Sequence, residues 1–569
     1  MKTNNKTAIS LIVLVITILV LSILATVVII NLSNINIIDR TQNVKKASDI
    51  AVMKEVANVA YTALYLKDKD NVTAQDVVNK LKEQGYTDEQ LDLIDIIKRD
   101  GEIYIKSKAI YGVRREVGSS STAWERIADS VGLVANACLG SASYVQNDFD
   151  NIYPWSEIVS YNYDSETDEV KAIYGDSDYR TDGTNGDVLT KIPEFYYKRE
   201  QKTENGKTYE YIYISEAERE GYSKSEKFSI GRYLSSFATD GNSLRSVSGA
   251  NVATNKSIDE FRNLAKTAEY TLMDYRYFAL QLLYLVEYAD YDSQATLGRG
   301  HVGYRYSQTK QGNTYVVTDK AIISATNSNT ITIPSTSAYK VGQQIDIGTG
   351  NLGQRDAQTQ TYRTITEIKS YNDGTNTGKS ITFDGDAIDI VAGSHGIWSC
   401  AQNTGSGDDL GMRSGYIGEN RYSAVVYRGV EDFFGNAWQF VDGVNIKRTS
   451  NTGEVYISYT QPYETNKFDG NYKKIGYTIP LNTNGLVTAL GYDTSNPLIS
   501  FAISTATSGT SLNDYCYFYS SSSSSNFLAL VGDYYCHGSN AGAFSWYIIN
   551  ESDTIEGNIR LHLSCRIVK

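Results

Sequence analysis

A long apolar run and an amphipathic repeat behind it are the clearest hydrophobic patterns in the chain. Residues 9–30 are 22 positions without a charged side chain, enough to cross about 30 Å of hydrocarbon as a helix. Over residues 39–66, apolar side chains return at close to the helical period. The two segments together predict one long N-terminal helix, apolar first and amphipathic after.

Two lysines, Lys2 and Lys6, precede the apolar run. Because the flank of a membrane helix that carries Lys and Arg faces the cytoplasm, the bulk of the chain is expected outside the cell. We therefore expect a single-pass protein of the cell membrane, held by residues 9–30. A cleaved signal peptide is the alternative, although its apolar core would be shorter, at about 7–15 residues.

Behind this helix the pattern predicts a small connector and then a larger part rich in short strands. The connector is expected to hold helices at 74–84 and 88–97 and a strand at 102–106. Aromatic-rich strands then alternate with Gly, Asp and Asn turns. Two helices interrupt them, at 257–267 and 274–288. The second helix is apolar on several faces, so we expect it to be buried.

Residues 315–391 show a different pattern. Short apolar and Thr-rich segments alternate there with Gly, Asn and Asp. The stretch resembles a small all-β barrel or sandwich inserted into a larger domain. Its edges are expected between Tyr304 and Cys400.

Charge and residue spacing exclude several functions. A net charge of −13 without a basic patch disfavours a phosphate binder, so no nucleic-acid partner is expected. The five Cys form no CxxC pair and the four His are scattered, so no zinc spacing appears. No Ser/His/Asp set or paired carboxylates stand out. The sequence indicates no cofactor and no metal ligands, and leaves calcium binding open.

A specific motif lies at residues 427–443, which read YRGVEDFFGNAWQFVDG. It resembles the formylglycine-generating-enzyme variant of the C-type lectin fold, which is used by phage tail adhesins and by the variable proteins of diversity-generating retroelements. Two positions depart from the family pattern, since Asp533 stands where a second Gly is common and Cys565 stands where Phe is usual. The segments near the chain end that are similar to the family are Val531-Gly532, Gly538, Ala541-Gly542-Ala543-Phe544 and Cys565-Arg566-Ile567-Val568.

The enzymes of this family oxidise a sulfatase cysteine with two closely spaced cysteines near the C-terminus. Here Cys516, Cys536 and Cys565 are 20 and 29 positions apart, so we expect no enzyme activity. Trp438 and Phe440 are expected to be core aromatics, because an aromatic pair on a strand packs well.

The N-terminal segment resembles type IV pilin-like proteins of Gram-positive bacteria. Residues 6–12 read KTAISLI, which matches a basic leader followed by an apolar start. Ala8 replaces the usual Gly before the processing site, and Val13 replaces the acidic residue expected five positions into the mature chain. The resemblance implies pilus subunits as partners, and a plain membrane anchor is the alternative.

Residues 511–545 contain no Lys, Glu, Gln, Met or Trp and are rich in Tyr, Ser and Asn, a composition typical of antibody-like binding surfaces. In the retroelement systems, randomised Asn codons end in a pyrimidine and cannot encode those five residue types. The resemblance therefore implies a diversified, solvent-facing patch. Its expected members are Asn513, Tyr515, Tyr517, Phe518, Tyr519, Asp533, Tyr534, Tyr535, His537, Ser539, Ser545 and Tyr547.

We therefore expect an α+β fold in four regions. These are a membrane-spanning pilin-like helix (1–35), an amphipathic helix with a small connector (36–118), a C-type lectin-like domain (119–305 and 398–569) and an inserted all-β domain (306–397). The expected function is a surface-displayed adhesin that binds a protein or cell-surface polymer through residues 511–547. A fixed-specificity adhesin of prophage or pilus origin is the alternative. An enzyme or a structural pilin is a third, more remote reading.

Overall fold

The computed structural model describes residues 42–565 except 70, 100, 312–313, 335–337, 350–359, 508–511, 519–524, 551–558 and 561. Strands hold 40% of the residues and helices 16%, so the predicted α+β class is wrong and the fold is mainly β. The predicted long N-terminal helix is not supported. The first described helix is α2 (Gln42–Tyr65), 24 residues long, and residues 9–30 lie outside the described residues. In the described part, no helix is both long and apolar enough to cross a membrane.

The strand content exceeds the expectation because several strands are long and rich in β-branched and aromatic residues. The clearest examples are β21 (Gln360–Asn372), with 13 residues, and β28 (Trp438–Thr449), with 12. Such side chains pack well on a pleated surface. The predicted helices at 257–267 and 274–288 do form, but they are short beside these strands.

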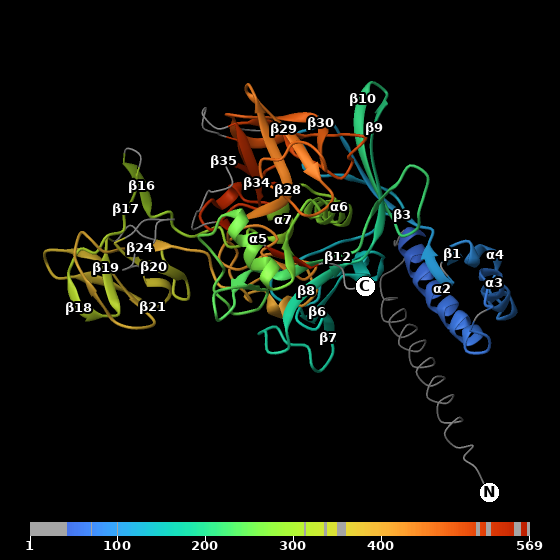
Figure 1. Ribbon diagram of the computed structural model, residues 1–569, viewed down its shortest axis with the longest axis horizontal. Helices are drawn as coiled ribbons and strands as arrows, with labels where there is room; N and C mark the ends of the chain where they lie inside the picture. The colour runs from blue at the N-terminus through green and yellow to red at the C-terminus, as the bar shows by residue number, and fades with distance from the viewer. Residues whose placement is uncertain are drawn as a thin grey trace, which may run out of the picture.

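The N-terminal described elements form a small unit at one end of the molecule (Figure 1). Its core includes Met53, Val77 and Leu81. The predicted helix at 74–84 and strand at 102–106 are confirmed. The helix predicted at 88–97 is wrong beyond Leu91, because the β-branched isoleucines that follow form a hairpin strand instead. The elements of the unit are α2, α3 (Ala74–Glu83), α4 (Asp88–Leu91), β1 (Ile94–Arg99) and β2 (Glu102–Ser107).

A six-stranded sheet lies in the central body (Figure 1). Its last strand in the sequence, β37, lies between β15 and β12 and is antiparallel to both, so Ser564 pairs with Thr271 and with Ile230. The strand order is β15 (Tyr270–Leu272), β37 (His562–Cys565), β12 (Phe228–Leu234), β8 (Asp187–Ile192), β6 (Val159–Asp164) and β7 (Glu169–Ile173).

A nine-stranded sheet carries most of the C-terminal sequence. The predicted core aromatics Trp438 and Phe440 lie on its strand β28 and are buried. The strand order is β30 (Tyr472–Pro480), β29 (Thr452–Ser458), β28, β34 (Asn526–Val531), β35 (Trp546–Asn550), β33 (Tyr515–Tyr517), β31 (Asn484–Leu490) and β32 (Ala502–Ala506), with β36 (Ile559–Arg560) paired to β28.

Helix α6 (Tyr277–Tyr288) lies under the nine-stranded sheet, and all twelve of its residues are buried, as predicted. Phe278 stacks on Trp546 of β35, with ring centroids 5.2 Å apart. The helix lacks a polar face because strands of two sheets cover it. The other helices of the central body are α5 (Ile258–Thr267), α7 (Ser293–Leu297) and the 3-10 turns η2 (Asp148–Asn151), η3 (Trp155–Glu157), η4 (Asp408–Leu410) and η5 (Gly538–Asn540).

Smaller sheets complete the central body. A five-stranded sheet has the order β11 (Ser223–Ser225), β9 (Phe195–Glu204), β10 (Lys207–Ser215), β3 (Ile110–Glu116) and β4 (Glu125–Ala128), and a four-stranded sheet has the order β27 (Val430–Glu431), β26 (Val426–Tyr427), β25 (Gly415–Ile417) and β5 (Cys138–Gly140). A short pair joins β13 (Ser236–Phe237) to β14 (Leu244–Arg245).

A separate β lobe lies at the end of the molecule opposite α2 (Figure 1). Its own core includes Ile331, Ile345, Ile365 and Ile381. Its main sheet has the order β19 (Thr330–Ile333), β22 (Thr377–Phe383), β21, β20 (Gln344–Gly348) and β24 (Gly396–Ser399). Two further two-stranded sheets pair β16 (Gln308–Gln311) with β17 (Thr314–Val317) and β18 (Ala325–Ser328) with β23 (Ile388–Ile390). The boundaries of the four predicted regions remain predictions.

Candidate functional site

The C-terminal segment singled out by its composition folds onto one part of the nine-stranded sheet. Strands β33 and β34 lie within it and β35 follows it directly, and Tyr517 of β33 pairs in parallel with Tyr547 of β35. The loop between β34 and β35 contains the turn η5. Residues about thirty positions apart therefore meet on one surface.

The twelve predicted site residues fall into distinct classes of exposure. Asn513 and Ser539 are exposed, while Tyr515, Tyr517, His537 and Tyr547 are half-buried. The expectation that all twelve face solvent is wrong for five of them, which are buried: Phe518, Asp533, Tyr534, Tyr535 and Ser545. Tyr519 lies outside the described residues.

Two local causes explain the buried members. Successive side chains of a strand point to opposite faces, so Phe518, directly after the half-buried Tyr517, turns into the core. Asp533 leaves β34 with φ of 68°, and the turn that it starts directs Tyr534 and Tyr535 inward. These side chains support the surface from below.

The half-buried aromatic side chains form a cluster around His537. Its imidazole stacks on Tyr517, with ring centroids 4.9 Å apart, and meets the ring of Tyr534 at 4.1 Å. Trp438 lies beneath, with its centroid 5.8 Å from that of Tyr517 and 5.5 Å from that of Tyr547. Since Trp438 is buried and comes from the GNAW motif, the motif forms the floor of the cluster.

The buried carboxylate of Asp533 also contacts the imidazole of His537. The Nδ1 atom of His537 lies 2.6 Å from Oδ1 of Asp533, which is buried. Burial raises the pKa of Asp533 above its ordinary value, and the nearby His537 opposes that rise. Beside the pair, burial also raises the pKa of the Cys536 thiol, so this cysteine is poorly suited to act as a nucleophile.

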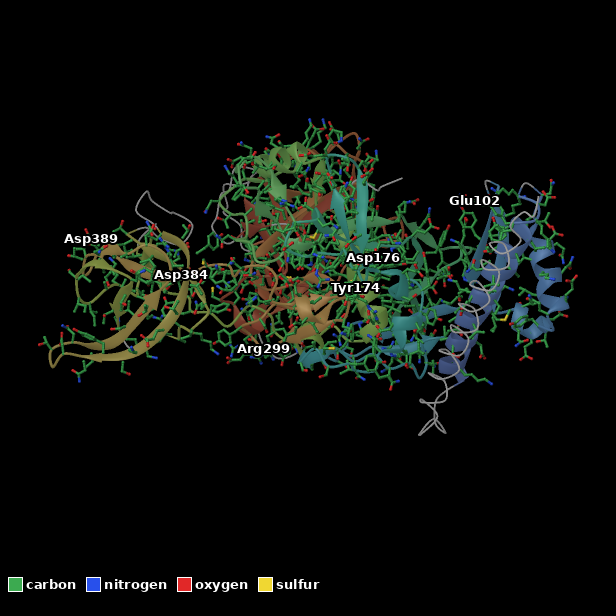
Figure 2. The ribbon with its side chains drawn as sticks, turned by 90° about the horizontal axis from the view of Figure 1, so that it is seen from below. Glu102, Tyr174, Asp176, Arg299, Asp384 and Asp389 are labelled. Atoms are coloured by element: carbon green, nitrogen blue, oxygen red, sulfur yellow. The ribbon has the colours of Figure 1, made fainter. Side chains whose placement is uncertain are left out.

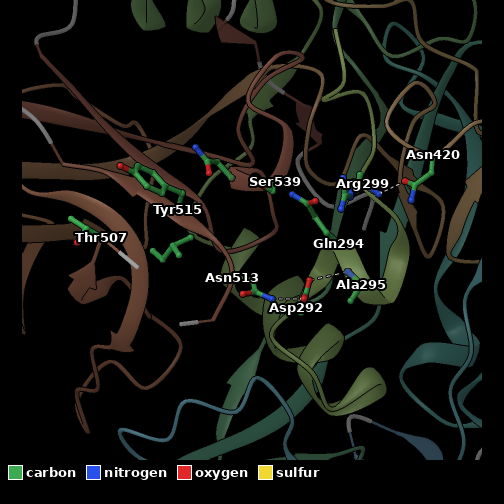
Figure 3. A pocket seen from close by; sticks show the side chains of 11 residues that line it. Asp292, Gln294, Ala295, Arg299, Asn420, Thr507, Asn513, Tyr515 and Ser539 are labelled. Atoms are coloured by element: carbon green, nitrogen blue, oxygen red, sulfur yellow. Dashed lines mark hydrogen bonds between the residues drawn. The ribbon is translucent and has the colours of Figure 1, made fainter. Parts of the chain in front are cut away.

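A groove of about 610 Å³ opens next to this cluster, within the ~300–1,000 Å³ range of small-molecule sites. Figure 3 shows Tyr515 and Thr507 on one side of it and Gln294, Arg299 and Asn420 on the other. Three predicted residues line it: Asn513, Tyr515 and Ser539. The full lining is Asp292, Gln294, Ala295, Arg299, Asn420, Leu486, Thr507, Asn513, Tyr515, Ser539 and Asn540.

The groove and the aromatic cluster are parts of one surface. Tyr515 lines the groove, and its ring centroid is 4.6 Å from that of Tyr517 in the cluster. Asn540 also lines the groove, and its Nδ2 donates to the hydroxyl of Tyr517 at 2.9 Å. A ligand in the groove would therefore contact residues that pack directly against the cluster.

The loop beside the groove is fixed through its main chain. Gln294 of α7 donates from Nε2 to the carbonyl of Gly538 at 3.0 Å and to that of Ala541. The carbonyl of Ala543 accepts from Gln281 at 2.6 Å. The amide of Ala543 donates to Oγ of Ser293 at 3.0 Å. Because these bonds involve backbone atoms, they do not depend on the side chains that the loop carries.

Five groove residues lie more than ninety positions before the C-terminal segment and were not predicted: Asp292, Gln294, Ala295, Arg299 and Asn420. They come from α7, the turn after it and the turn before β26. Asp292 accepts a hydrogen bond from Asn513 (Figure 3). Local sequence patterns carry no signal for such residues, because only the topology brings them to the groove.

The GNAW motif itself is structural. Asn436 accepts from the amide of Gln402 at 2.7 Å and donates back to its carbonyl at 3.0 Å. Glu431 accepts from the amides of Gly405 and Gly407 at 2.6 and 2.7 Å. Burial raises the pKa of Glu431 to about 7. The motif thus ties the chain that leaves the β lobe to the central body.

In the described part of the chain, no three His, Cys, Asp or Glu side chains are arranged to hold a metal ion. Comparison with protein-family models finds no match, and comparison with curated proteins finds none either.

Proposed function

We propose that the chain is a surface-displayed ligand-binding protein whose C-terminal face, about residues 511–547, is a diversified binding site. The groove beside Tyr515 is the proposed ligand site. One observation carries the proposal: the loop beside the groove is held by hydrogen bonds between its backbone and the side chains of Gln281, Ser293 and Gln294. A scaffold of this kind tolerates changes of exposed side chains such as Ser539, as a diversified site requires.

The relationship to retroelement variable proteins and tail adhesins belongs to this proposal and rests on the motif at 427–443. The location on the cell surface, with residues 9–30 as anchor, likewise rests on the sequence. The burial of Phe518, Tyr534 and Tyr535 removes them from the proposed contact residues. Asn513, Tyr515 and Ser539 remain, and Asn540, which also lines the groove, is added to them. The half-buried Tyr517, His537 and Tyr547 of the adjacent cluster remain as well.

An adhesion assay tests the binding function. Beads coated with the full chain are mixed with a panel of bacterial and host cells, and retained cells are counted. We expect retention by some cell types, and loss of it in the Tyr515→Ala protein. Tyr174→Ala is the matched control, since Tyr174 is exposed and lies away from Arg299 of the groove (Figure 2). Retention by no cell type, or equal retention by both variants, would contradict the proposal.

Diversification is tested separately, by sequencing the DNA around the coding region. A reverse-transcriptase gene and a near-copy of the segment for residues 511–545, differing at adenines, are expected there. If both are missing while the beads still adhere, the chain is a fixed-specificity adhesin with the same groove.

A further inference from the structure

We infer that the groove takes an acidic oligosaccharide, with a sugar ring packed on Tyr515 and a carboxylate held by Arg299. This inference rests on the proposed function and names its ligand class. It is carried by three features of the groove: a lining dense in hydrogen-bonding groups, one accessible aromatic ring and one arginine, Arg299, that has no ion pair among the described residues.

The lining matches a ligand with many hydroxyl groups. Nine of the eleven lining residues have polar side chains, and only Ala295 and Leu486 do not. Amides such as Asn513 and Asn540 both donate and accept, as sugar hydroxyls do. A protein ligand is usually anchored by apolar or aromatic side chains in dry pockets, and of these this lining offers only Tyr515, Leu486 and the small Ala295.

Tyr515 supplies a surface for the apolar face of a sugar ring. Its ring packs against Tyr517 and also lines the groove. The face of an aromatic ring is electron-rich, so it attracts the weakly positive C–H groups of a pyranose. The backbone amide of Tyr515 donates to Oγ of Ser545 at 3.3 Å, and Ser545 is buried. The ring is therefore carried on a fixed strand.

Arg299 supplies the charge that selects an acidic sugar. It lies at the surface of the central body (Figure 2), and its backbone amide donates to Oδ1 of Asn420 at 2.7 Å. Among the described residues its guanidinium has no ion pair. The groove carboxylate, Asp292, is engaged by the side chain of Asn513 and by the amide of Ala295. A guanidinium binds a carboxylate through two parallel hydrogen bonds.

The experiment is isothermal titration of the full chain with three probes of matched length: a galacturonic acid tetramer, a galactose tetramer and a tetraglutamate peptide. We expect the galacturonate to bind about tenfold more tightly than the galactose, as the strength of a charge-assisted hydrogen bond implies. Tyr515→Ala should weaken both sugars. Arg299→Gln should reduce the galacturonate affinity to that of the neutral sugar, whereas Arg180→Gln, an exposed arginine outside the groove, should change neither.

Four outcomes overturn the inference. Equal affinity for both sugars removes the role of Arg299, and an unchanged galacturonate affinity in Arg299→Gln does the same. Tight, Arg299-dependent binding of the peptide alone assigns the groove to acidic proteins. If no probe binds while beads still adhere through Tyr515, the sugar assignment fails and the proposed function stands. If beads do not adhere either, the proposed function fails as well.

Discussion

The Nδ1 atom of His537 and the Oδ1 atom of Asp533 lie 2.6 Å apart, one turn of chain from each other, with the carboxylate buried and the imidazole half-exposed. The other carboxylate oxygen, Oδ2, has no hydrogen-bond partner among the described residues. Oδ1 also accepts a hydrogen bond from the amide of Tyr534 at 2.7 Å, so the buried carboxylate has one main-chain donor and one neighbouring side chain, that of His537.

Replacing His537 by Gln should lower the free energy of unfolding by roughly 1–3 kcal/mol, because a buried carboxylate loses its partner. Urea denaturation at neutral pH measures the effect. The double variant Asp533→Asn/His537→Gln should recover part of the loss. Ser539→Ala, on the same loop but exposed, should stay within about 0.5 kcal/mol of the parent. A loss in the double variant as large as in the single one would show that the charge is not the cause.

Removing Arg428 should be more severe. Its guanidinium lies 2.7 Å from Oε1 of Glu287 and 2.7 Å from Oδ1 of Asp150, and Glu287 is fully buried. Arg428→Met would leave that carboxylate uncompensated, at a cost of about 3–5 kcal/mol. Arg428→Lys keeps the charge but not the planar fork, so a smaller loss is expected. Thermal unfolding of the parent, Arg428→Met and Arg428→Lys proteins separates the loss of the charge from the loss of the planar geometry. Equal losses of stability in the two variants would contradict this prediction.

Stability should fall in acid through His301. This side chain is buried between Tyr304 and Ser406, and burial lowers its pKa from 6.5 to about 3. Because the folded-state pKa is depressed, the unfolded chain binds the proton more readily below pH 6.5, and stability drops by up to about 1.4 kcal/mol per pH unit. In His301→Gln the slope of the unfolding free energy between pH 6.5 and 4 should be shallower. Parallel curves would contradict the prediction.

Gly542 should be intolerant of a side chain. A Cβ atom there would lie 1.9 Å from Oδ1 of Asp514, and the other oxygen of that buried carboxylate accepts from the amide of Phe544 at 2.6 Å. Gly542→Ala should therefore displace the loop that carries Ser539 and Asn540. We expect a loss of about 1–3 kcal/mol in unfolding free energy and weaker bead adhesion. Parent-like adhesion and stability of Gly542→Ala would show that the loop accommodates the added methyl group.

Local patterns were sufficient for elements whose periodicity is plain. Helix α5 begins one residue after its predicted start, at the capping box formed by Ser257 and Glu260. The helix predicted at 88–97 was wrong beyond Leu91, because residues 94–99 form backbone hydrogen bonds with the strand β2 that follows them. A local helical pattern does not reveal such a partner strand. The fold class was predicted wrongly for a similar reason, since many strands are identified only by their pairing with neighbouring strands.

The site was predictable in part. The composition of residues 511–545 pointed to Asn513, Tyr515 and Ser539, which do line the groove. It could not separate Tyr515 from Tyr534, because both are tyrosines in the same window and only the turn at Asp533 buries the second. Arg299 lies more than two hundred positions earlier, and nothing near it in the sequence marks it as a groove residue.

The position of β37 has a consequence for synthesis. Its two neighbours, β15 and β12, are made roughly 290 or more residues before it. At about 5–20 residues per second, their facing edges stay unpaired for some 15–60 s. During that time each edge can pair with any passing strand. Correct folding of the central body is thus a matter of timing, and a chaperone that covers these edges until the ribosome finishes would raise the yield.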